Sequence, residues 1–233
     1  TFRYVDVPDK STQMAAFRTG KLDAGLDATR DQAGDLLRTA PHLKQKIINF
    51  GTSSNRIAMQ MTNPSAPWKD IRVRRALMLG TDHPEIVKSF YGGAADVQAF
   101  PLPGAPELYL LGWAIPLKEL PVDVQELYEY HPDKAKQLLK EAGYPNGFKT
   151  AITISGSSPA DVDVASILKD QWAKIGVELT LDIKESGVVT AWVANASYPD
   201  MVFDSKWGTA TLYNKFGPPP NAMNSENADD PRI

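Results

Sequence analysis

The 233-residue sequence predicts an α/β protein whose mixed, largely parallel sheet is flanked by helices. Residues 149–204 read as strand, helix, strand, helix, strand. Within them "VELTLDI" (177–183) alternates apolar and polar residues strictly, as a half-buried strand does. A bounded helix at 132–142 precedes this run. Strands that alternate with helices in this way are typical of parallel sheets with right-handed crossovers.

The helix at 132–142 has both of its ends marked in the sequence. Pro132 and Asp133 suit a first turn, because proline needs no amide donor there and a carboxylate faces the positive end of the helix dipole. Gly143 can adopt the left-handed conformation that ends a helix. One apolar stripe consists of Ala135, Leu138, Leu139 and Ala142. We expect Leu138 and Leu139 inside, and Lys134, Lys136 and Lys140 in solvent.

The segments after this helix are predicted in order. Strands are expected near 150–155, 177–183 and 200–204, with a helix at 159–175 and a shorter one at 186–197. The side chains expected in the core are those of Leu168, Trp172, Leu179 and Leu181.

Earlier in the chain the pattern is less regular. We expect strands at 2–7, 44–50 and 56–62. We expect helices after Asp9, from Asp70 and from His83, the first and last of which close at glycines. Residues 94–130 hold several prolines and little periodicity. Long irregular segments are usually functional or disordered, and the aromatic residues here argue against disorder, so Phe100 is a candidate ligand contact.

Composition excludes several classes of function. The net charge of −3 gives no electrostatic footprint for nucleic acid, and the short cluster "RVRR" (72–75) is read as a solvated helix face. There is no cysteine, which excludes disulfides and thiolate metal sites. His42, His83 and His131 have no partners at metal-ligand spacing. We therefore expect no metal, no cofactor and no catalysis.

The ends of the chain and its hydropathy carry three further expectations. The sequence opens "TFRYVDVPD", without methionine and already in alternation, so we expect that residue 1 is not the natural start. No apolar run approaches the roughly 20 residues of a membrane span. The polar, proline-rich end reads as an exposed tail or an interrupted loop.

Three segments in order carry a family resemblance: "AAFRTGKLDAG" (15–25), "PWKDIRVRRALMLGTDHPEIV" (67–87) and "HPDKAKQLLKEAGYPNGF" (131–148). With "LKDQWAKIGVELTL" and "SKWG" after them, the chain resembles extracytoplasmic solute-binding protein family 5, the oligopeptide, dipeptide and nickel class of ABC importer receptors. The resemblance implies a class II periplasmic-binding-protein fold, a clamshell about twice this length. Residues 1–57 would be the latter part of the first lobe (lobe I), and 58–233 the second lobe (lobe III), incomplete at its C-terminal end.

Ligands of open α/β sheets bind beyond the carboxyl ends of the strands. The loop 155–158 occupies such a place, and the hydroxyls of Ser155 and Ser157 could meet a polar group there. The alternative is that Ser158 only caps the helix that begins at Pro159.

The resemblance adds Trp207, which matches a cleft tryptophan of the family. Oligopeptide members carry an aspartate three residues later that meets the ligand's ammonium, whereas this chain has Ala210. Peptide recognition through that position is therefore in doubt, and Asp204 could substitute for it.

The function that this implies is capture of a peptide-like or other small solute outside the cytoplasm by a monomer, which then delivers it to a membrane permease. The protein would lie in the periplasm or on the cell surface as a lipid-anchored protein. Two alternatives stay open: a sensor or chemoreceptor input domain of the same fold, and an α/β hydrolase-like enzyme.

Overall fold

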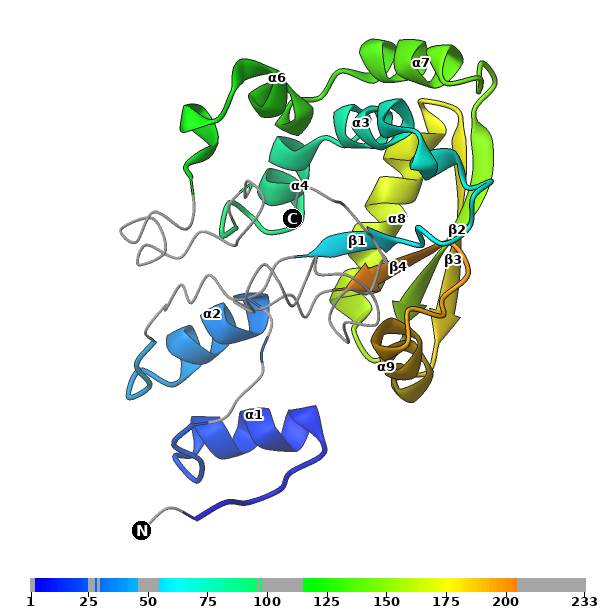
Figure 1. Cartoon of the computed structure of the whole chain (residues 1–233). Coiled ribbons are helices and arrows are strands. Elements are labelled where there is room, and N and C mark those ends of the chain that lie inside the picture. Colours follow the sequence, from blue (N-terminus) through cyan, green and yellow to red (C-terminus); the bar gives the residue numbers. More distant parts are fainter. Residues whose placement is uncertain are drawn as a thin grey trace. The chain divides into compact units, whose positions relative to one another are not determined.

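A computed structural model describes residues 3–24, 28, 30–45, 55–95, 97 and 115–204 (Figure 1). The chain divides into two compact units, residues 1–49 and 50–233. The predicted boundary between residues 57 and 58 runs through a strand that belongs wholly to the second unit. The assignment of the chain to lobes of a clamshell stays a prediction.

The first unit contains the helices α1 (Lys10–Arg18) and α2 (Arg30–Thr39). The carboxylate of Asp9 caps α1 by accepting from the Thr12 amide at 2.8 Å. Arg18 of α1 and Asp35 of α2 form an ion pair at 2.8 Å. The predicted helix after Asp9 is confirmed, whereas α2 was not predicted.

The predicted strand at 2–7 is wrong for its described residues, 3–7, which form no regular element. Alternation alone does not make a strand, because the backbone groups also need a neighbouring strand to pair with. The described residues of the first unit contain no strand with which residues 3–7 could pair. Of the predicted strand at 44–50, residues 44 and 45 are irregular and the rest lies outside the described residues.

The second unit is an α/β layer structure. Its elements are β1 (Arg56–Met59), η1 (Pro67–Lys69), α3 (Ile71–Leu79), α4 (His83–Ser89), η2 (Leu117–Glu119), α6 (Val122–Gln125), η3 (Glu126–Tyr128), α7 (Pro132–Glu141), β2 (Phe148–Ser155), α8 (Pro159–Ala173), β3 (Val177–Lys184), α9 (Ser186–Ala194) and β4 (Met201–Asp204). The helices expected from Asp70 and from His83 are confirmed as α3 and α4.

The described strands form one mixed sheet in the order β1-β4-β2-β3. β2 is parallel to β3 along its whole length and parallel to β4, so the predicted βαβαβ run is confirmed. β1 is antiparallel to β4, with Arg56 opposite Asp204. The sheet is therefore mixed and largely parallel, as predicted.

Each face of the sheet packs against helices. Alternate residues of β1 and β4 point to opposite faces, so that Met59 and Met201 join the main core with α3, α7 and α8, while Ala58 and Val202 pack under α9. Leu168, Trp172 and Leu179 are buried in the main core as predicted. Leu181 is only partly buried, because β3 lies at the edge of the sheet near its carboxyl end.

α7 ends as its sequence predicts. Gly143 has φ of 94°, and its amide donates to the Lys140 carbonyl while the Tyr144 amide donates to Leu139. These two bonds form a Schellman motif, which satisfies carbonyls left without partners at the helix end. Leu139 is 1% exposed. The three lysines are exposed as predicted, whereas Leu138 is only partly buried.

The turns that precede β2 and β3 touch each other. Gly147 has φ of 74° and Gly176 has φ of 88°. A Cβ atom on Gly147 would lie 1.8 Å from the carbonyl oxygen of Gly176. Phe148 and Val177 follow directly and pair with each other. The close approach of the two glycine backbones therefore fixes the start of β2 against the start of β3, where Phe148 pairs with Val177.

Among the described residues, no helix is both long enough and apolar enough to cross a membrane.

Candidate functional site

The carboxyl edge of the sheet gathers several chain segments. The parallel strands β2, β3 and β4 end there at Ser155, Lys184 and Asp204. Because β1 is antiparallel, it begins at the same edge with Arg56. The predicted loop at 155–158 and the end of β4 thus lie at one edge, on neighbouring strands. Asp204 is described only through its backbone, as the last residue of β4.

Residues 155–158, which we call the serine loop, carry two hydroxyl groups that are joined by a hydrogen bond. Ser155 Oγ and Ser157 Oγ lie 2.8 Å apart, and the Gly156 amide donates to the Lys184 carbonyl at 2.9 Å. Ser157 is exposed and Ser155 is half-buried. The loop is therefore anchored to β3 through its backbone, while one hydroxyl reaches solvent.

The alternative expectation, that Ser158 caps the helix beginning at Pro159, is confirmed for its position only. Ser158 is the N-cap residue, but its side chain makes no capping hydrogen bond. Its carbonyl instead accepts from the amides of Asp161 and Val162. Pro159 in the first turn has no amide to satisfy, which lessens the need for a side-chain acceptor.

Sequence reasoning missed a polar group on the α8 side of this edge. The side-chain amide of Asn55 donates to the Tyr91 hydroxyl at 2.5 Å, which joins the start of β1 to the segment after α4. Burial, followed by the negative charge of Asp161, raises the pKa of Tyr91, while the hydrogen bond from Asn55 lowers it. Asp161 lies in the first turn of α8. Three segments distant in sequence thus supply one polar cluster, which we call the edge cluster: Asn55, Tyr91 and Asp161.

The remaining predicted site residues are not placed by the structure. Phe100, Trp207 and Ala210 lie outside the described residues. Their roles stay predictions that rest on the sequence and on the family resemblance.

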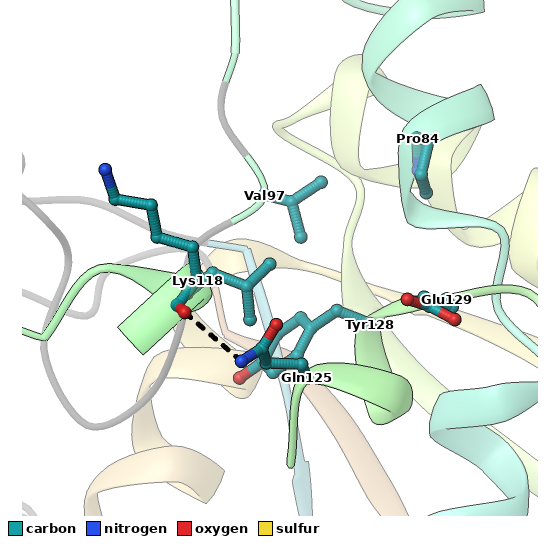
Figure 2. A pocket seen from close by; sticks show the side chains of 7 residues that line it. Pro84, Val97, Lys118, Gln125, Tyr128 and Glu129 are labelled. Carbon is teal, nitrogen blue, oxygen red and sulfur yellow. Dashed lines mark hydrogen bonds between the residues drawn. The ribbon is translucent and has the colours of Figure 1, made fainter. Parts of the chain in front are cut away.

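A separate hollow of about 370 Å³ lies beside α4 (Figure 2). Figure 2 shows Lys118, Gln125, Tyr128 and Glu129 around it, and the Gln125 amide donates to the Lys118 carbonyl at 3.2 Å. Glu129 Oε2 also accepts a hydrogen bond from Nε2 of the His131 ring, at 2.9 Å. Since the side chains of Gln125 and Glu129 already bond neighbouring protein groups, the hollow is a weaker candidate than the carboxyl edge.

His83 begins α4 next to this hollow, and its ring centroid lies 5.7 Å from that of Tyr128. Its Nε2 atom is buried and has no hydrogen-bond partner among the residues that the structure describes. Burial lowers the pKa of His83 from 6.5 to about 4, against a smaller opposing effect of Asp82. A buried neutral imidazole of this kind is a structural group with a consequence for stability.

We expect acid to destabilise the protein through His83. Between pH 6.5 and 4 the unfolded chain binds a proton that the folded protein excludes, so stability falls as the pH falls. The slope is at most about 1.4 kcal/mol per pH unit. Urea unfolding at several pH values, for the protein and for His83→Phe, measures it. The variant should show a flatter profile, and equal slopes would contradict the assignment.

No group of three or more His, Asp or Glu side chains within the described ranges could hold a metal ion.

Comparison with known proteins defines the class. The model of the bacterial extracellular solute-binding proteins, family 5, middle part, matches residues 1–227. Heme-binding protein A of Haemophilus influenzae is 33% identical over 181 residues, which cover 74% of this chain and 29% of that protein. Glutathione-binding protein GsiB of Shigella flexneri is 26% identical over 245 residues, 94% of this chain and 42% of that protein. The chain thus spans less than half the length of these relatives.

Solved structures show the same fold. The periplasmic binding protein DppA of Helicobacter pylori, in complex with the peptide STSA, has a TM-score of 0.70 at 21% identity and matches 97% of this chain and 42% of its own. The oligopeptide-binding protein AppA of Bacillus subtilis, in complex with a nonapeptide, has a TM-score of 0.74 at 21% identity, with 97% and 45% covered. The fold is that of periplasmic binding proteins. The chain belongs to family 5 of the bacterial extracellular solute-binding proteins.

Proposed function

We propose that this chain is part of the ligand-binding component of an ABC importer, which captures a peptide-like or other small solute and delivers it to a membrane permease. The observation that carries the proposal is the family match over residues 1–227. In such a receptor the ligand shifts an equilibrium between open and closed forms, and the closed form docks on the permease. The protein binds and releases its ligand and catalyses no reaction.

The carboxyl edge of the sheet is the proposed binding surface. It follows the general rule for open α/β sheets, and it presents the exposed Ser157 hydroxyl together with Ser155. We propose that these two groups, with Asp204, Trp207 and Phe100, contact the ligand. A broad tryptophan ring suits this role because it covers apolar ligand surface and still offers an N–H donor.

The organisation around the site follows from the family. We propose that residues 1–57 belong to the first lobe of a clamshell and 58–233 to the second, that the protein is monomeric, and that it acts in the periplasm or at the cell surface through a lipid anchor. The proposed partner is the permease. Relatives named for binding heme or glutathione support a broad range of candidate solutes, of which a peptide-like one fits the solved complexes.

Titration calorimetry on the chain tests this function. The probes are the peptide Ser-Thr-Ser-Ala, glutathione and hemin, and binding of any of them with a saturable isotherm supports a solute receptor. Turnover of a peptide or an ester by the protein would overturn the proposal in favour of an enzyme.

Trp207→Ala is the informative variant for the site. We expect at least a tenfold loss of affinity for the probe that binds, about 1.4 kcal/mol, with an unchanged melting temperature. The matched control is Trp192→Ala on α9, whose side chain packs partly buried under the sheet and should lower stability rather than affinity. A collapse of melting in Trp207→Ala would make that residue part of the core instead.

A further inference from the structure

We propose that Asn146 is a modification site, at which spontaneous deamidation is slowed by the fold and the isoaspartyl product detaches β2 from β3. In this reaction the side-chain amide is lost, and the residue becomes aspartate or its isomer isoaspartate. The site lies in the turn between α7 and β2, at the amino ends of the parallel strands. The inference is independent of the proposed function, whose binding surface is at the opposite edge.

The sequence of this turn, "YPNG" (144–147), places asparagine directly before glycine. Asn146 is exposed, and no hydrogen bond joins its side-chain amide to another residue that the structure describes. Because glycine has no Cβ, no side chain on Gly147 screens its amide nitrogen from the carboxamide that precedes it. Asn146 therefore has the neighbouring nucleophile and the open space that ring closure requires.

The reaction takes two steps and consumes only water. The Gly147 amide nitrogen loses its proton and bonds to Cγ of Asn146, while the bond from Cγ to Nδ2 breaks and ammonia leaves with that proton. Water then opens the resulting cyclic imide. Cleavage between Cγ and the nitrogen gives aspartate. Cleavage between the main-chain carbonyl carbon and the nitrogen gives isoaspartate, in which the main chain runs through Cβ and Cγ and is one carbon atom longer.

The fold withholds the Gly147 amide from this reaction. Its N–H donates to the Tyr144 carbonyl at 3.0 Å, and this hydrogen bond stabilises the nitrogen in its protonated form. Ring closure also requires the peptide between Asn146 and Gly147 to rotate. Gly176 lies against that peptide, since a Cβ on Gly147 would be 1.8 Å from the Gly176 carbonyl oxygen. The turn must therefore open before Asn146 reacts, and the rate reports how often it opens.

The isoaspartyl product does not fit the folded turn. Its longer main chain lies directly before Gly147 and Phe148, where β2 begins and pairs with Val177 of β3. The backbones of Gly147 and Gly176 are already in close contact, so the added carbon atom displaces one from the other. The aspartyl product adds only a charge at an exposed position. The two products should therefore differ in their effect on stability.

A simpler account is that Asn146 only serves the turn, because asparagine after proline is common in turns. That account predicts no dependence of the chemistry on folding. It also predicts no difference in stability between the two products.

Tryptic peptide mapping measures the reaction. Cleavage after Lys140 and Lys149 releases residues 141–149, in which Asn146 is the only side-chain amide, so a mass gain reports this position alone. The chain is incubated in mildly alkaline buffer with and without guanidinium chloride. We expect Asn146 to react at least about tenfold faster in the denaturant, where no folded turn has to open first.

Asn195 is the internal control in the same digest. It is exposed like Asn146, but its side-chain amide donates to the Ala191 carbonyl at 3.0 Å and the next residue, Ala196, carries a Cβ. Residues 185–206 form one tryptic peptide with Asn195 as its only side-chain amide. We expect this peptide to gain mass slowly under both conditions.

Pro145→Gly tests whether the turn sets the rate. Pro145 is exposed, and its replacement loosens the turn without altering the reacting residues. The rate at Asn146 should rise about two- to fivefold in native buffer, the size of a proline's effect on chain entropy, and should not change in guanidinium chloride. Circular dichroism checks that the variant is folded.

Pulse proteolysis of the aged chain near its melting temperature tests the effect of the product. The aspartyl and isoaspartyl forms of the peptide 141–149 have the same mass but elute separately. The isoaspartyl form should be depleted among the surviving molecules, because the less stable protein is digested first. Asn146→Asp, which carries the charge without the added carbon atom, should melt as the unmodified chain does.

The remaining outcomes count against the inference. Equal rates with and without guanidinium chloride, or no mass gain at Asn146 in either, would overturn it. An unchanged native rate in Pro145→Gly would show that the turn does not slow the reaction. Equal survival of the two products would show that isoaspartate leaves β2 in place. None of these measurements involves a ligand, so the receptor function fails or stands separately.

Discussion

Gly147→Ala should destabilise the protein by more than about 4 kcal/mol, in the range that only a few mechanisms reach. The new methyl carbon would lie 1.8 Å from the carbonyl oxygen of Gly176 and 2.3 Å from its carbonyl carbon. Both are backbone atoms, so no side chain can rotate away. The positive φ of 74° adds the cost of a left-handed conformation, roughly 1–2 kcal/mol. Urea unfolding followed by circular dichroism measures the loss.

Gly143→Ala is the matched control for this experiment. Gly143 also has a positive φ, 94°, yet a Cβ there would meet nothing within 4 Å. It should therefore show only the conformational cost, about 1–2 kcal/mol. If the two variants lost equal stability, the contact between the turns at Gly147 and Gly176 would have no part in holding β2 against β3.

Leu139→Ala should lower the free energy of unfolding by about 2–5 kcal/mol. The Leu139 side chain is 1% exposed and belongs to the main core. The loss combines the apolar surface returned to water with the cavity that remains. Thermal and urea unfolding of the purified variant give the free energy of unfolding.

Lys140→Ala serves as the comparison for Leu139→Ala, since Lys140 is the next residue of the same helix and is exposed. It should change stability by no more than about 0.5 kcal/mol. A loss below that figure for Leu139→Ala would show that the apolar stripe of α7 packs against nothing that matters for stability.

The sequence was most informative where local pattern and tertiary environment agree. Val177 and Leu179 alternate with polar residues and are buried on one face, and Gly143 ends α7 in the conformation that glycine allows. The strand expected at 2–7 failed because its alternation has no partner strand among the described residues. α2 was missed because its sequence, "RDQAGDLLRT", is polar and holds a glycine.

For the candidate site, too, the sequence predicted one part and missed another. The rule that ligands bind beyond the carboxyl ends of parallel strands is enough to place the serine loop at that edge from the sequence. The edge cluster was not predicted because Asn55, Tyr91 and Asp161 are far apart in sequence and form no motif. Their proximity depends on β1 being antiparallel to β4, and hydropathy does not reveal the direction in which a short strand pairs. The only local hint is that Asn55 and Tyr91 each stand at the end of a regular element.

The pairing of β1 with β4 also governs when this sheet can be completed during synthesis. Arg56 is opposite Asp204, so β1 leaves the ribosome long before its partner exists. At the usual 5–20 residues per second, roughly 7–30 s separate the two strands. During that interval α3, α7 and α8 can begin to assemble around β2 and β3, but Met201 and Phe203 are missing from the main core. Of the described strands, the first one made is thus among the last to find its place, and the nascent second unit carries an unpaired strand edge until β4 has emerged.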